Sequence, residues 1–147
     1  MHAKEVFPRC AFVPFGGTNV GYALGHMVAA RRFPRPSCVF LDGDTAEAPG
    51  CTLLPGGDAP ERVVFSGLRA TRWGDLWVRI ARDISAVDDA CTAAMTLGDH
   101  HDWVRFAANQ LLCGGDTLWQ AMCAEWAKRT PDSEANRVSQ VIEDTLA

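Results

Sequence analysis

Lysine is nearly absent from this chain of 147 residues. Of its 14 basic residues, only Lys4 and Lys128 are lysines. The 18 Asp and Glu residues outnumber the 14 Lys and Arg residues, so the formal net charge is −4. An acidic balance of this kind argues against a general basic surface for nucleic acids. The basic residues are almost all arginines, which can still form a local cationic groove.

The sequence also lacks several features of secreted, membrane and zinc-binding proteins. No run of residues approaches the length of a membrane span, and "MHAKEVFPRC" has no apolar core typical of a signal peptide. No two cysteines form a Cys-x-x-Cys pair, which argues against structural zinc. We therefore expect a cytoplasmic protein without membrane partners, with reduced and mostly buried thiols. The cysteines are Cys10, Cys38, Cys51, Cys91, Cys113 and Cys123.

The composition, with 48% hydrophobic and 22% charged residues, is typical of a globular domain. The length fits a single domain, residues 1–147. "CAFVPF" (10–15) and "CVFLD" (38–42) are apolar runs that predict strands. Between them a helix of about 20–31, capped by Thr18 or Asn19, would carry Val20, Leu24, Met27 and Val28 on one face. This order predicts a parallel βαβ unit, with a short strand near 51–54 after it.

From Pro60 onward the patterns predict helices, with Pro60 in a first turn and Asp99 and Asp116 as N-caps. One predicted helix is "WGDLWVRIARDI" (73–84). The fold class expected is α/β, with a βαβ core in residues 1–68 and a predominantly helical layer in residues 69–147. Four tryptophans at helical spacings are expected in the core between helices: Trp73, Trp77, Trp119 and Trp126.

The stretch "FLDGDT" places Asp42 and Asp44 at the carboxyl end of a predicted parallel strand. Open α/β sheets bind their ligands at this edge. Two carboxylates in this arrangement can face one crevice, because Gly43 lets the backbone bend between them. Hard cations such as Mg²⁺ favour carboxylates together with water and phosphate oxygens. The alternative interpretation is a solvated turn.

Three motifs together resemble the Toprim domain of the overcoming-lysogenization-defect (OLD) type ATP-dependent nucleases. They are "FVPFGGTNV", "VFLDGDT" and "LLPGGDAPE", which occur in this order between about residues 11 and 68. The resemblance implies a Toprim-like core in which Asp42, Asp44 and Glu61 hold Mg²⁺ or Mn²⁺ for phosphodiester cleavage in DNA. It further implies an ATPase partner, assembly as a homo- or hetero-oligomer, and a role in antiviral defence.

This sequence departs from the Toprim pattern at its start. Toprim domains open with a strand that ends in a catalytic Glu, but only nine residues precede Cys10. We therefore expect that the first strand and its Glu come from a partner or from a missing N-terminal segment. The alternative is a catalytically inactive interaction module that docks on an ATPase partner through its Trp-rich helices. Arginines are candidates for contacts with DNA phosphates or for a solvated helix face, among them Arg69, Arg72, Arg79 and Arg82.

Two further stretches are candidates for ligand binding. "GGTN" (Gly16, Gly17, Thr18 and Asn19) can form a phosphate-binding loop at a helix start, although no Walker A motif is present. "DHH" (Asp99, His100 and His101) has three interpretations: a helix cap with exposed histidines, a contribution to the nuclease site, or the metal motif of a DHH-type phosphoesterase.

Overall fold

The computed structural model describes residues 7–147, and their contacts divide the chain into two units. The first unit runs up to Ala59 and also contains Pro131–Ala147, whereas the second is Pro60–Thr130. The expectation that no signal peptide is present concerns a stretch that begins outside the described residues. The first unit contains η1 (Phe7–Arg9), α2 (Thr18–Ala29), β1 (Val39–Leu41), β2 (Cys51–Leu53) and α8 (Asp132–Leu146). The second contains α3 (Pro60–Ala70), α4 (Leu76–Arg79), α5 (Ile84–Ala94), η2 (His100–Asp102), α6 (Trp103–Gln110) and α7 (Gly115–Ala127).

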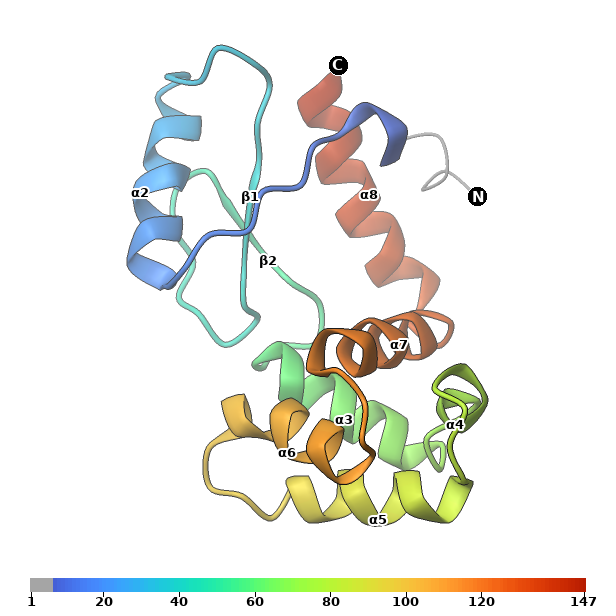
Figure 1. The fold of residues 1–147 in the computed structure, drawn as a ribbon. Coiled ribbons are helices and arrows are strands. Elements are labelled where there is room, and N and C mark those ends of the chain that lie inside the picture. Colours follow the sequence, from blue (N-terminus) through green and yellow to red (C-terminus); the bar gives the residue numbers. More distant parts are fainter. Residues whose placement is uncertain (1–6) are drawn as a thin grey trace. The chain divides into compact units, whose positions relative to one another are not determined.

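The first unit is built on a parallel pair of strands. β1 and β2 pair in register from Val39 opposite Cys51 to Leu41 opposite Leu53. In Figure 1 this pair lies between α2 and α8. Arg137 of α8 donates a hydrogen bond to the carbonyl of Leu53 over 3.1 Å. The coarse α/β class and both of these strands are as the sequence predicts.

The predicted strand at 10–15 and the βαβ unit built on it are wrong. Residues 10–15 form no strand, and β1 pairs instead with β2 through the link 42–50. Pro14 has no N–H to donate to a sheet ladder. Phe12 is 60% exposed and Val13 is 79% exposed, so the apolar run is not buried as a sheet strand would be.

Helix α2 packs against the strands through glycines rather than through its large apolar residues. Gly21 and Gly25 are its buried residues, whereas Val20 and Met27 are exposed, which corrects the predicted apolar face. A Cβ on Gly21 would overlap Leu41, and one on Gly25 would overlap Cys51 and the carbonyl of Pro49. The helix therefore approaches the sheet at a distance that only glycine permits.

The second unit contains the main hydrophobic core. Phe65, Leu68, Leu76, Leu118 and Met122 are fully buried where α3, α4 and α7 meet. Helices dominate this part of the chain, and α3 begins at Pro60 as predicted. The predicted N-cap role of Asp116 is wrong, because Gly114 is the N-cap of α7 and Asp116 lies in the first turn.

The single helix predicted at 73–84 is wrong as well. The backbone is left-handed at Arg72, Trp73 and Gly74 and again at Ala81, so only the short α4 forms between these points. Asp83 then accepts a hydrogen bond from the backbone of Ser85 and starts α5.

The broken helix separates the predicted tryptophan pair. Trp73 is buried and its indole donates to Asp88 over 2.7 Å, but Trp77 is 38% exposed. Trp119 and Trp126 are half-buried against the core, and Trp103 is also buried.

The six cysteines are all free thiols, as expected, but only Cys91 is fully buried. Burial raises the pKa of Cys91 to about 12 and that of Cys123 to about 11. Among the described residues, no helix combines the length and the apolar character needed to cross a membrane.

Candidate metal centre

The histidines of "DHH" lie on η2, between α5 and α6. Asp99 is the N-cap of this short helix and accepts a hydrogen bond from the backbone N–H of His101 over 3.0 Å. The capping interpretation of Asp99 is thereby confirmed. A carboxylate in this position satisfies a backbone donor that has no partner within the helix.

Trp103 holds η2 against α3. Its indole donates to the carbonyl of Leu97 over 3.1 Å, and its ring meets that of Phe65 edge-on at a centroid distance of 5.4 Å. Phe65 lies one turn after Glu61 on α3, on the same side of that helix. The contact between the two rings therefore also brings the histidines to Glu61.

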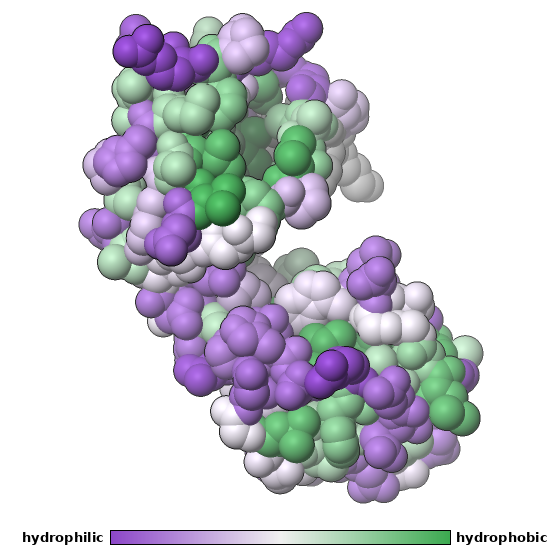
Figure 2. Space-filling view, turned by 60° about the vertical axis from the view of Figure 1, so that its left-hand side comes forward, coloured by the Kyte–Doolittle hydropathy of each residue, from purple (hydrophilic) through white to green (hydrophobic). Residues whose placement is uncertain are grey.

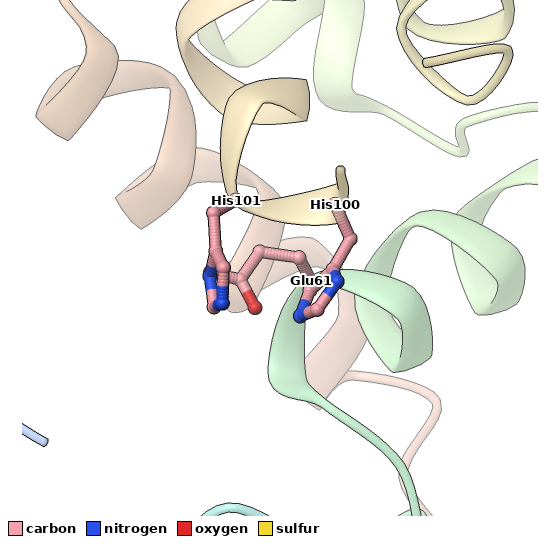
Figure 3. A group of neighbouring side chains, drawn as sticks. All are labelled: Glu61, His100 and His101. Atoms are coloured by element: carbon pink, nitrogen blue, oxygen red, sulfur yellow. The ribbon is translucent and has the colours of Figure 1, made fainter. Parts of the chain in front are cut away.

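Glu61, His100 and His101 form a group in which one ligand atom from each side chain lies within 4.8 Å of the others. Figure 3 shows the three side chains together, with Glu61 reaching from α3 toward the two imidazoles of η2. Oε1 of Glu61 is 3.6 Å from Nδ1 of His101. The imidazole rings lie 4.1 Å apart between centroids. Glu61 and His100 are half-buried and His101 is exposed, so the group opens to solvent.

This donor set is suited to a metal ion. Two imidazoles and one carboxylate form a common three-ligand set for zinc and non-haem iron, which leaves positions for water or substrate. Ligand bonds of about 2.0–2.2 Å place the donors of a tetrahedral ion roughly 3.4 Å apart. Small side-chain rotations would therefore close the present group around an ion.

An open groove of about 200 Å³ adjoins this group. Its lining belongs entirely to the second unit and comprises Glu61, His101, Val104, Gly115, Asp116 and Trp119. Two of these residues are also members of the ligand group. A small molecule in the groove would therefore lie beside a bound metal ion.

The sequence-predicted acids lie in different units. Asp42 and Asp44 are exposed on the turn that follows β1, closed by a hydrogen bond from the N–H of Thr45 to the carbonyl of Asp42. They occupy the loop after this strand, as predicted. Glu61 belongs to the second unit, where its neighbours are His100 and His101. A site made of Asp42, Asp44 and Glu61 stays a prediction.

The loop Gly16-Gly17-Thr18-Asn19 is exposed at the start of α2. Gly17 is the N-cap, with a φ of 79°, and its carbonyl accepts hydrogen bonds from the N–H groups of Val20 and Gly21. The predicted capping by Thr18 or Asn19 is wrong, because the helix begins at Thr18 and no side chain caps it. Phosphate binding at this loop stays a prediction.

Two of the arginine candidates have intramolecular partners. Arg79 forms a 3.0 Å ion pair with the buried Glu125. Arg82 donates to the carbonyls of Leu111 and Leu112 over 2.6 and 2.9 Å. Both side chains hold the second unit together, which does not favour them as contacts to DNA.

Of the six residues that line the groove, only Glu61 and His101 were site candidates from the sequence. Asp116 was expected only as a cap, and Trp119 only as a core residue. Their spacing of three residues places them on one side of α7, which is the one available signal. Nothing in the sequence links this side of α7 to "DHH".

Comparison of the chain with family models, with curated proteins and with solved structures finds no match.

Proposed function

We propose that this chain binds one divalent metal ion through Glu61, His100 and His101 and acts as a metal-dependent hydrolase. The observation that carries the proposal is the convergence of these three side chains beside an open groove. A divalent ion bound there supplies Lewis acidity and lowers the pKa of a coordinated water. Glu61 and the histidines hold such an ion and leave one side of it open to the groove.

The donor set favours a transition metal over Mg²⁺. Imidazole nitrogen suits Zn²⁺, iron and similar ions, whereas Mg²⁺ prefers oxygen ligands. Of the two ions that the Toprim resemblance implies, Mn²⁺ is the one that accepts both donor types. We therefore propose Mn²⁺ or Zn²⁺ at this group.

The substrate class that we propose is a phosphodiester of DNA. The support for it is the resemblance of "FVPFGGTNV", "VFLDGDT" and "LLPGGDAPE" to the OLD-type Toprim nucleases. The position of Asp42 and Asp44 after a parallel strand fits this resemblance. In this proposal an ATPase partner supplies the Glu that opens the Toprim pattern, and the assembly acts in antiviral defence.

A second candidate is an interaction module without catalytic activity. The exposed Trp77, Val78 and Ile84 in the second unit favour it, because large apolar side chains in water are typical of binding surfaces. A DHH-type phosphoesterase is not proposed, because Asp99 caps η2.

Titration calorimetry with Mn²⁺, Zn²⁺ and Mg²⁺ tests the metal site. Wild-type protein should bind Mn²⁺ or Zn²⁺ more tightly than Mg²⁺, at one ion per chain. Glu61→Gln should weaken binding at least about 100-fold, because even the loss of a group that only supports a ligand costs about 10–100-fold. Glu47→Gln, an exposed carboxylate on the link between β1 and β2, is the matched control.

Plasmid cleavage with Mn²⁺, with and without an ATPase partner, tests the reaction. Cleavage that Glu61→Gln abolishes and Glu47→Gln retains would support the nuclease. Metal binding without cleavage in any assembly would leave the metal site standing and contradict the assignment to DNA.

A further inference from the structure

Asp116 lies in the first turn of α7 and lines the same groove as Glu61 and His101. Gly114, the residue before this helix, provides no side-chain cap, and Asp116 makes no capping hydrogen bond either. Its carboxylate is exposed. The sequence pattern assigns Asp116 a capping role that the structure does not use.

Asp116 is not among the ligands of the candidate metal group. That group comprises Glu61, His100 and His101, whose ligand atoms lie within 4.8 Å of one another. Asp116 lines the groove from α7, whereas Glu61 comes from α3 and His101 from η2. A carboxylate that lines the groove without belonging to the ligand group is suited to contact a water molecule rather than the ion itself.

The other groove residues support the same arrangement. Val104 and the half-buried Trp119 provide apolar surface, while Glu61 and Asp116 are the carboxylates of the lining. Neither Lys nor Arg lines the groove among the described residues, so a bound metal ion would be its main positive charge. An apolar wall strengthens the attraction between such an ion, its water and a nearby carboxylate.

We propose that Asp116 is the catalytic base of this site, an assignment that rests on the metal-dependent hydrolase proposed above. The Asp116 carboxylate accepts one proton from the attacking water. The water oxygen then forms a bond to the phosphorus of the phosphodiester as the bond from phosphorus to the leaving oxygen breaks. The leaving oxygen takes the proton from Asp116, which returns to its ionised form.

The test compares Asp116→Asn with Asp89→Asn, an exposed aspartate of α5 that does not line the groove. Calorimetry first measures Co²⁺ affinity. The visible spectrum of the Co²⁺-loaded protein then measures azide binding, which requires an open position on the metal. Hydrolysis of bis(p-nitrophenyl) phosphate with Mn²⁺ gives the catalytic rate.

Asp116→Asn should retain Co²⁺ affinity within about threefold, because it removes no ligand. Azide should bind several times more tightly, because the carboxylate that repels an anion at the open position is gone. The rate of hydrolysis should fall by about 10²–10⁴, the usual contribution of a positioned base. Asp89→Asn should match wild type in all three measurements.

Unchanged azide affinity in Asp116→Asn would overturn the assignment, whatever the rate of hydrolysis. A loss of Co²⁺ affinity of tenfold or more would also overturn it, because Asp116 would then be a ligand. If wild-type protein binds no metal, the proposed hydrolase fails and the base assignment fails with it. If wild-type protein binds metal but Asp116→Asn shows unchanged azide affinity, only the base assignment fails and the proposed metal site stands. The two failures are therefore distinguishable.

Discussion

Nδ1 of His101 lies 3.6 Å from Oε1 of Glu61, although the two residues come from different helices and His101 is largely exposed. An ion pair at so exposed a position contributes little to stability. Metal binding by these side chains can therefore be tested by substitutions that hardly change the stability of the metal-free protein.

His101→Ala and His100→Ala should leave the thermal midpoint of the metal-free protein nearly unchanged. Wild-type protein should gain about 2.7 kcal/mol of stability at a metal concentration 100 times the dissociation constant, and both variants should lose this gain. Differential scanning calorimetry with and without Zn²⁺ measures the effect. His26→Ala, an exposed histidine of α2, is the control. A gain of wild-type size in both histidine variants would exclude this metal site.

Glu125 should be the main source of acid sensitivity in the second unit. Burial alone would raise its pKa, but hydrogen bonds from Lys128, Arg129, the N–H of Asp75 and Arg79 outweigh burial and hold the pKa well below its usual range. A carboxyl whose folded pKa is lowered contributes stability above its unfolded pKa of about 4.3 and loses it as pH falls further.

Glu125→Gln should therefore be less stable than wild type at pH 7 by about 1–3 kcal/mol, because it weakens the charged hydrogen bonds that Arg79, Lys128 and Arg129 donate to this buried side chain. The difference should narrow as pH falls below about 4. Urea unfolding from pH 7 to pH 3 measures it. Glu134→Gln, a half-exposed carboxylate of α8 paired with Arg137, should show little change. A difference that does not vary with pH would contradict the assignment to Glu125.

Trp73→Ala should cost about 3–5 kcal/mol, because the indole is buried and packs edge-on against Phe65. The same change also leaves Asp88 without its indole donor. Trp77→Ala should cost far less, since that ring is 38% exposed. Urea unfolding followed by far-ultraviolet circular dichroism compares the two variants. Equal losses would mean that Trp77 contributes to the core after all.

Gly25→Ala should destabilise the first unit by about 1–3 kcal/mol through overpacking, because its new methyl group would overlap Cys51 and the backbone of Pro49. Gly16→Ala meets no neighbouring atom and should have little effect. Hydrogen exchange at β1 and β2 reports the stability of this unit directly. Protection that is unchanged in Gly25→Ala would show that α2 can move away from the strands without cost.

The sequence by itself determined the features that depend on neighbouring residues. Pro60 begins α3, Asp99 caps η2, and the run at 38–41 becomes a parallel strand. Each of these follows from local backbone preferences or from a short apolar pattern. The same patterns were misleading at 10–15, where an apolar run with Pro14 has no strand partner among the described residues.

Only the tertiary structure decided which residues meet across the chain. Glu61 was predicted as a metal ligand beside Asp42 and Asp44, yet its observed neighbours are His100 and His101. The packing of Trp103 on Phe65 makes this contact, and no local pattern specifies it. Left-handed residues at Arg72, Trp73 and Gly74 likewise separate Trp73 from Trp77. Helical spacing predicts which side chains share a face, but long-range packing determines whether that helix forms and what its face contacts.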